Sequence, residues 1–252
     1  MRIISRLLFV FVFMLWTGAA LRAEEYATDD EVYEYAISVP RYIENDLDRL
    51  TRYLTRPYHN KYDKAKSIAY WIASHVIYDG YVLEKKSDGY AGYTKVGKKY
   101  DVQDGWDLME SRVGICADYA VLFMEMASKA GIKAKIVSGK IRKLGHERDF
   151  IPKQYDLGHA WNSFRYMGRD IYVDTTWMAQ GRSMEVDKRA SKREHERALK
   201  KVKKGNKKVS HVYSINPYYF DFTYDRYNKY SHPKNEPADK GIIRIGNWFD
   251  PE

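Results

Sequence analysis

GICADYA, residues 114–120, contains the only cysteine of this chain of 252 residues, and the rest of the sequence is best interpreted from it. Two further segments follow: GHAWN at residues 158–162 and VDTTW at residues 173–177. In that order they supply a thiol, a histidine and an aspartate, which are the parts of a nucleophile, its base and the group that orients the base. Cys116, His159 and Asp174 are therefore the candidate catalytic residues.

The segment that begins at Cys116 has the apolar spacing of a largely buried helix, and Gly131 marks its end. A cysteine at a helix N-terminus lies beside unpaired backbone N–H groups and the positive end of the helix dipole, which favour the thiolate. We therefore expect an accessible and acidic thiol at Cys116.

Short β-type segments follow this helix. Residues 132–138 alternate, His159 begins a second run, and residues 171–174 form a third run after a turn at 167–170. So short a turn predicts a hairpin, in which His159 and Asp174 lie side by side on one sheet face with the Cys116 helix packed against that face.

Upstream, apolar residues at helical spacing predict one helix that ends at Arg56-Pro57 and another from Asp63 to about Val76, followed by a turn at residues 78–80. Residues 84–105 show no clear period and predict a surface loop.

GICADYA, GHAWN and YVDTTW resemble the Cys, His and Asp blocks of the transglutaminase-like superfamily, in its branch of bacterial secreted cysteine peptidases. The stretch from residue 64 to Tyr78-Asp79 is similar to the helix that precedes the core in those proteins. The resemblance covers about residues 60–180, and a weaker similarity extends to residues 216–220 and 230–233.

The resemblance implies an α+β fold with a papain-like core, in which the nucleophile helix packs on an antiparallel sheet. It implies Cys116 as nucleophile, His159 as base and acid, and Asp174 as the orienting residue, with no metal or cofactor in the chemistry. Relatives place a polar or aromatic side chain before the nucleophile to complete the oxyanion hole. Tyr100, Gln103 and Trp106 are in range, and we favour Gln103 because an amide donates directly to an oxyanion.

The N-terminus has the features of a secretory signal peptide: two arginines, an apolar run from Leu7 to Trp16 and small residues before a cleavage point after Ala20 or Ala23. We expect a signal peptide at 1–23, an N-terminal helical extension at 24–59 and a catalytic domain at 60–252. The predicted location is secreted, periplasmic or in the cell envelope, without an integral membrane segment after cleavage.

Positive charge is concentrated in an insertion at residues 182–208, which contains 12 basic and four acidic side chains. Removing residues 1–23 takes away three arginines and no acidic residue, so the net charge of +9 becomes +6, less than the net +8 of the insertion alone. The insertion is either a solvated charged helix or a segment that attracts an anionic envelope polymer. Nucleic acid is not an expected partner of a secreted protein.

The expected function is cleavage or transfer of an amide bond in a peptide or protein substrate through a cysteine thioester. Two alternatives remain: a transglutaminase that links glutamine to amines, and an inactive envelope-binding module with the same fold. No metal site is expected, and one cysteine excludes cysteine-based zinc motifs. We assign no role to six histidines without a matching context: His59, His75, His146, His195, His211 and His232.

Overall fold

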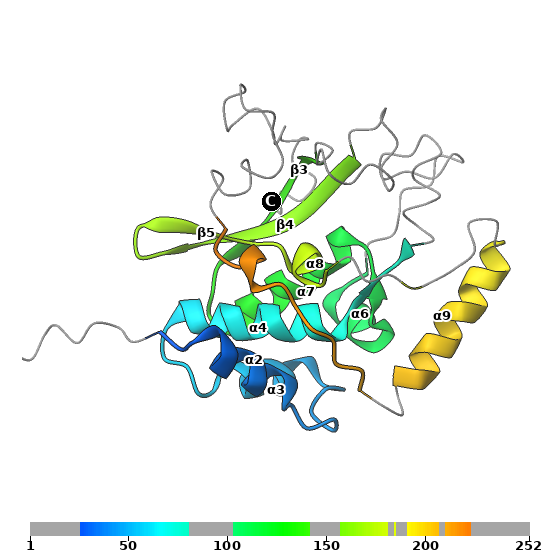
Figure 1. Ribbon diagram of the computed structural model, residues 1–252, viewed down its shortest axis with the longest axis horizontal. Coiled ribbons are helices and arrows are strands. Elements are labelled where there is room, and N and C mark those ends of the chain that lie inside the picture. Colours follow the sequence, from blue (N-terminus) through cyan, green and yellow to red (C-terminus); the bar gives the residue numbers. More distant parts are fainter. Residues whose placement is uncertain are drawn as a thin grey trace, which may run out of the picture.

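The computed structural model of the protein describes residues 26–80, 103–141, 157–180, 184, 191–206 and 210–222 (Figure 1). The predicted signal peptide lies outside these residues, as does most of the predicted loop at 84–105. The helices and strands, in chain order, are α2 (Asp29–Ile37), α3 (Leu47–Thr55), α4 (Lys61–His75), β1 (Ile77–Tyr78), α6 (Gly105–Ser111), β2 (Val113–Gly114), α7 (Cys116–Lys129), β3 (Ala134–Ile141), β4 (Leu157–Tyr166), β5 (Arg169–Val173), α8 (Thr175–Met178), α9 (Lys192–Asn206) and the 3-10 helix η1 (Pro217–Tyr219).

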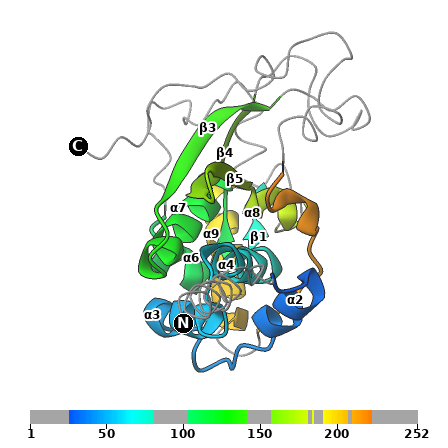
Figure 2. The same ribbon diagram turned by 90° about the vertical axis from the view of Figure 1, so that its left-hand side faces the viewer.

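The strands β3, β4 and β5 form an antiparallel sheet in that order, and α7 packs against β3 and β4. Figure 2 shows the sheet along one side of the molecule, with α7 and α8 beneath it and α4 further in. Asn162 of β4 is fully buried and its side-chain amide donates to the Ala120 carbonyl of α7 at 3.0 Å. The predicted α+β fold, with the nucleophile helix on an antiparallel sheet, is confirmed.

The hairpin of β4 and β5 is also confirmed. Its two turn residues, Met167 and Gly168, have φ angles of 46° and 81°. Positive φ at both central positions matches the right-handed twist of the two strands, and glycine adopts such a conformation without steric cost.

Helix α4 is the centre of the main core. The sequence predicts one apolar face, but the helix is buried around its circumference from Asp63 to His75. It packs against α2 and α3 on one side and α7 and α8 on the other, which explains why small and large apolar residues occupy all of its faces (Figure 2). Helices α2 and α3 share this core, while the domain boundary at residue 59 stays a prediction.

Strands β1 and β2 form a two-stranded parallel pair, where the sequence predicts a turn. Ile77 pairs with Val113 and Tyr78 with Gly114, and the Asp79 N–H donates to the Gly114 carbonyl at 2.9 Å. Two residues are too short for a periodic sequence signal. The pair places Tyr78 beside the segment that leads into Cys116.

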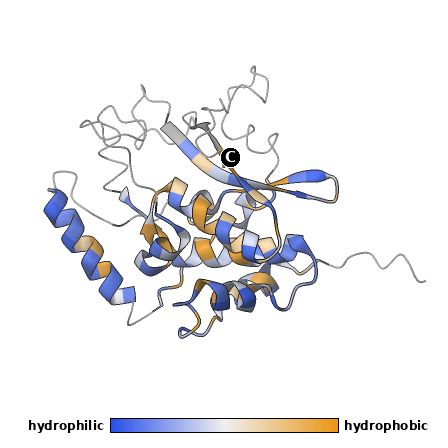
Figure 3. Cartoon of the chain, turned by 180° about the vertical axis from the view of Figure 1, so that it is seen from behind, coloured by the Kyte–Doolittle hydropathy of each residue, from blue (hydrophilic) through white to orange (hydrophobic). Residues whose placement is uncertain are grey.

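Helix α9 covers part of the predicted basic insertion and lies at the edge of the molecule next to α6 (Figures 1 and 3). Seven basic and two acidic side chains lie on it, and Figure 3 shows it as largely hydrophilic. Within the described ranges, none of the helices is apolar over a length that would cross a bilayer.

We predict that Gly114→Ala lowers the free energy of unfolding by about 1–3 kcal/mol. A Cβ there would lie 2.6 Å from Cδ1 of Leu108 and 2.8 Å from Oδ2 of Asp118, and both of these residues are fully buried. Gly205→Ala is the matched control, because a Cβ on Gly205 meets no described atom within 4 Å and alanine favours the helix. Urea unfolding of both variants measures the difference. Equal loss in the two, or none in Gly114→Ala, would contradict the prediction.

Candidate active site

Cys116 is the first residue of α7, and a buried carboxylate holds the backbone that precedes it. The Ile115 N–H donates to Oδ2 of Asp118 at 2.7 Å. Oδ1 of the same carboxylate accepts the backbone N–H of Gln103 at 2.8 Å. Asp118 is fully buried, so these backbone groups would lose hydrogen bonds that water cannot replace if the carboxylate were removed. The carboxylate therefore sets the path of the chain into the cysteine.

The side chain of Gln103 is engaged in the same segment. Its Nε2 donates to the Val113 carbonyl at 3.0 Å and to Oδ2 of Asp118 at 3.3 Å, and its Oε1 accepts from the Ser111 hydroxyl at 3.0 Å. Both amide hydrogens thus have acceptors in this conformation. A role for Gln103 in an oxyanion hole stays a prediction. Of the other two candidates, Trp106 is 51% exposed on α6 and Tyr100 lies outside the described residues.

His159 and Asp174 form a short buried pair. Nε2 of His159 lies 2.6 Å from Oδ2 of Asp174, and the two residues are 5% and 1% exposed. Because Nε2 is directed to the carboxylate, Nδ1 is the ring nitrogen left for the side-chain hydrogen bond between His159 and Cys116. The structure therefore brings Cys116, His159 and Asp174 together in the order thiol, imidazole, carboxylate.

Asp174 reaches His159 from a helix terminus. The pairing of β4 with β5 ends at Asn162 and Val173, so the expectation that His159 and Asp174 are neighbours on two strands is wrong in this detail. Asp174 follows β5 directly and is the N-cap of α8, where its Oδ1 accepts the Trp177 N–H at 3.0 Å. Each carboxylate oxygen of Asp174 thus has its own donor. The hydrogen bond from the Trp177 N–H to Oδ1 fixes the direction of Oδ2 toward His159.

Two indole rings stack on the imidazole of His159. The ring of Trp161 lies 5.7 Å from it and that of Trp177 lies 5.4 Å from it, with interplanar angles of 25° and 28°. Aromatic faces at this distance attract a cation. The two tryptophans therefore favour the protonated imidazole.

The protonation of His159 follows from opposing effects. Burial alone lowers the pKa of an imidazole, but the charge and hydrogen bond of Asp174, together with Cys116, outweigh it and raise the pKa of His159 to about 10. At neutral pH the imidazole is then protonated.

Tyr78 is a residue of the candidate site that the sequence did not predict. Its hydroxyl accepts the backbone N–H of Cys116 and also contacts the cysteine side chain. Burial, followed by the charge on Cys116, raises the pKa of Tyr78 well above its ordinary value, so the phenol keeps its proton and remains a donor. The only available signal was the position of Tyr78 just after the helix, where the sequence predicts the start of a turn at residues 78–80.

Cys116 is only 6% exposed, so the expectation of an accessible thiol is wrong for this conformation. Among the described residues no three His, Cys, Asp or Glu side chains are grouped as a metal site would require.

A helix that begins at a cysteine and packs on an antiparallel sheet, with a histidine beside the cysteine and an aspartate bound to that histidine, is the arrangement of a papain-like fold. The chain belongs to the transglutaminase-like superfamily, whose family model matches residues 48–180, more than half of the sequence. The match includes Cys116, His159 and Asp174.

Individual relatives are more distant. The chain is 27% identical over 132 residues to human kyphoscoliosis peptidase and 26% identical over 136 residues to the mouse protein, which covers 52% and 54% of this chain. The matched segment makes up 18% of each relative's length. A solved structure of a TGase aligns with a TM-score of 0.41 at 15% identity, covering 74% of this chain and 42% of the other.

We predict that Asp174→Asn lowers the pKa of His159 while the cap of α8 remains, since asparagine is an equally good N-cap. In the unaltered protein, NMR should show the His159 ring still protonated as pH rises through 6.5 and deprotonating only near 10. In Asp174→Asn the ring should deprotonate at lower pH. A wild-type ring that titrates near 6.5 would contradict the prediction.

The same shift links stability to pH. The folded-state pKa of His159 is raised, so its contribution is fully present below about 6.5 and is lost as pH approaches 10. This is best measured in Cys116→Ala, where the thiol adds no proton change. The pKa of His159 is then raised by Asp174 without Cys116, so the free energy of unfolding should fall above about 6.5 and complete its fall below 10, and Asp174→Asn should flatten the fall. Asp46→Asn, at the exposed N-cap of α3, is the control and should leave the slope unchanged.

Proposed function

We propose that the protein is a cysteine-dependent hydrolase that cleaves an amide bond of a peptide or protein through a thioester on Cys116. The observation that carries the proposal is the position of His159, whose Nε2 is 2.6 Å from the Asp174 carboxylate and whose other nitrogen faces the thiol. Such an arrangement fixes the imidazole in the orientation needed to exchange a proton with sulfur and then with the substrate.

In the proposed mechanism the Cys116 thiolate attacks the substrate carbonyl carbon and a C–S bond forms. The protonated His159 then gives its proton to the amide nitrogen as the C–N bond breaks, and the amine leaves. Water attacks the thioester while His159 takes its proton, the C–S bond breaks as the acid is released, and the pair of thiolate and protonated imidazole is restored. Asp174 keeps the ring in one orientation through both halves of the cycle.

Tyr78 and the Cys116 N–H are the proposed donors to the oxyanion of each tetrahedral intermediate. In the resting structure this N–H donates to the Tyr78 hydroxyl oxygen. An oxyanion placed between them would accept from both, because the phenol keeps its own proton. Two fixed donors in a water-poor site are the usual means of stabilising an acyl-transfer transition state.

Hydrolysis is proposed over amine transfer, and a peptide bond over other amides. In support, the two relatives named above are called peptidases. The signal-like N-terminus supports a place of action outside the cytoplasm, in the periplasm or the cell envelope. The basic segment at 182–208 is proposed to attract anionic envelope polymer, which would concentrate the enzyme near its substrate.

We predict that incubation with a defined peptide library yields new free-acid termini, with an intermediate in which Cys116 has gained the mass of an acyl group. Mass spectrometry, with a primary amine in excess, detects both. Cys116→Ala should give neither product nor intermediate, and comparison of its thermal unfolding with that of the unaltered chain verifies its fold.

The other outcomes separate the alternatives. Predominant amine adducts would replace hydrolysis by transglutaminase activity. If no peptide gives an acyl-cysteine and the thiol is alkylated only after denaturation, the enzymatic proposal is wrong. A binding module with the same fold would then be the remaining alternative.

A further prediction concerns Tyr78. Tyr78→Phe should lower kcat by about 10²–10³-fold, the usual loss for one oxyanion donor, with little change in KM. Tyr35→Phe is a matched control, because it also removes a tyrosine hydroxyl with a hydrogen bond, to the Tyr53 carbonyl, but on α2. Unchanged kcat in Tyr78→Phe would exclude Tyr78 from the oxyanion hole.

A further inference from the structure

Strand β1 lies between the nucleophile and helix α9. Successive side chains of an extended strand point to opposite faces. On one face the Tyr78 hydroxyl contacts the Cys116 N–H and the cysteine side chain. On the other face Ile77 lines the cavity beside α9, and the Asp79 carboxylate contacts His195 of that helix. A shift of β1 relative to α9 would therefore move the Tyr78 hydroxyl relative to Cys116.

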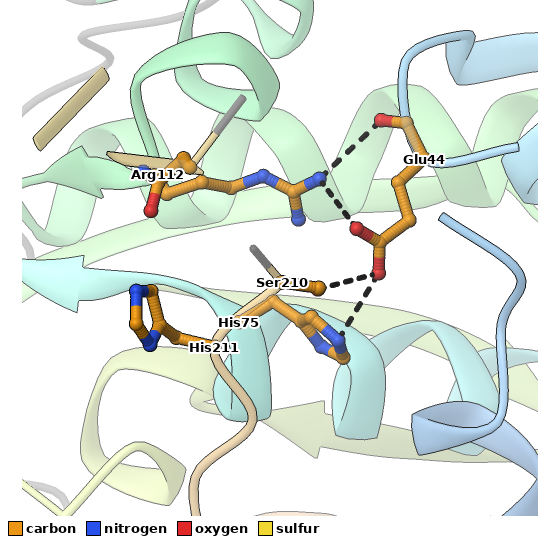
Figure 4. Close-up of a pocket in the computed structure, with 6 residues that line it drawn as sticks. Glu44, His75, Arg112, Ser210 and His211 are labelled. Atoms are coloured by element: carbon orange, nitrogen blue, oxygen red, sulfur yellow. Dashed lines mark hydrogen bonds and ion pairs between the residues drawn. The ribbon is translucent and has the colours of Figure 1, made fainter. Parts of the chain in front are cut away.

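The body of the protein fixes the beginning of this strand. The Ile77 N–H donates to the Arg112 carbonyl at 3.0 Å. Nη2 of Arg112 lies 3.7 Å from one carboxylate oxygen of Glu44, and Nε2 of His75 lies 3.3 Å from the other. Figure 4 shows these side chains and Ser210 converging on the same carboxylate. The chain before β1 and its partner strand are thus both anchored where β1 begins.

The basic insertion supplies contacts at the other end of β1. The Tyr78 carbonyl accepts the Met184 N–H at 2.7 Å. The Asp79 backbone N–H donates to Gly114 of β2, but its carboxylate is held from α9: Nε2 of His195 lies 3.1 Å from Oδ1 and 2.9 Å from Oδ2. Asp79 and His195 are 4% and 8% exposed, so water replaces little of this contact if the imidazole is removed. Two residues of the insertion thus hold Tyr78 and the residue that follows it.

Helix α9 is in a position to hold Asp79 because its other end is fixed as well. The Asn206 side chain donates to the Ser111 carbonyl at 3.1 Å, and Nη2 of Arg41 donates to the Asn206 carbonyl at 3.2 Å. A carboxylate only accepts hydrogen bonds, so Nε2 of His195 is the donor to Asp79. The contact therefore joins β1 to a helix that is anchored to the body independently of β1.

From this arrangement we infer that His195 is a positioning residue for Tyr78. Its hydrogen bond to Asp79 keeps β1 at the place where the Tyr78 hydroxyl meets the Cys116 N–H. A pair of two-residue strands has too few hydrogen bonds of its own to be rigid, so contacts from outside the pair decide its position. The catalytic consequence rests on the proposed function, in which the Tyr78 hydroxyl and the Cys116 N–H bind the oxyanion.

The first test needs no substrate. Hydrogen exchange at the Cys116 amide, followed by NMR, reports whether the Tyr78 hydroxyl still accepts this N–H. His195→Leu should speed the exchange by about 3–10-fold, the size expected for the loosening of one hydrogen bond. His195→Gln should keep it near that of the unaltered chain, because the glutamine Nε2 can donate to Asp79 from the same distance along the side chain. If His195→Leu fails to fold, His195→Asn takes its place, because asparagine is too short to reach the carboxylate.

Asn206→Ala is the matched control, because it removes the side-chain hydrogen bond at the other end of α9 and leaves β1 untouched. It should not change exchange at Cys116. The Asp174 amide, which donates to the Tyr219 carbonyl at 2.9 Å, is the internal reference for a general loss of stability. Unchanged exchange at Cys116 in His195→Leu, an equal rise at Cys116 and Asp174, or an equal rise in Asn206→Ala would overturn the inference, whether or not the protein cleaves peptides.

With a cleaved peptide, kinetics test the catalytic consequence. His195→Leu should lower kcat by about 10–10²-fold with little change in KM, as a small displacement of an oxyanion donor would, and His195→Gln should restore most of it. In Tyr78→Phe, where the phenol is already absent, adding His195→Leu should cause little further loss. Full additivity of the two substitutions would mean that His195 does not act through Tyr78 and would overturn the inference. If no peptide is cleaved, the proposed function fails, and exchange at Cys116 alone decides the inference.

Discussion

The carboxylate of Asp174 is the interaction on which the geometry of the site depends. One oxygen accepts the Trp177 N–H at the start of α8 and the other binds the His159 imidazole, while the backbone N–H of Asp174 donates to the Tyr219 carbonyl at 2.9 Å. Three elements therefore fix the position of the Asp174 side chain: α8, η1 and the end of β5. A buried carboxylate is stable only when its oxygens have donors, and here the donors that stabilise it are also those that orient it.

A second buried carboxylate performs the equivalent task for the nucleophile. Asp118 binds the backbone on both sides of α6, at Gln103 and at Ile115, and so closes the chain into a tight path before Cys116. The close approach at Gly114 follows from this path, since a side chain there would collide with Asp118 itself. Two carboxylates, each with several donors, thus position the thiol and the imidazole independently.

Different interactions hold helices α4 and α9 in the fold. Helix α4 is buried around its circumference and contributes stability through apolar contact, with Tyr70 and Trp71 among its largest fully buried side chains. Helix α9 contributes little apolar burial, and polar contacts at its ends hold it.

The sequence by itself indicated the helix that begins at Cys116 and the hairpin of β4 and β5, because periodicity and turn residues are local signals. Its motifs implied the α+β class through the family that they resemble, and they offered Cys116, His159 and Asp174 as candidate catalytic residues. Only the tertiary structure decided that Asp174 acts from a helix cap, that the phenol of Tyr78 lies at the Cys116 N–H, and that Gln103 hydrogen-bonds to its own loop. These features depend on where a strand ends and on a two-residue parallel pair between distant segments. Neither the end of the strand nor the parallel pair produces a periodic pattern in the sequence, because packing and hydrogen bonds between distant segments determine both features.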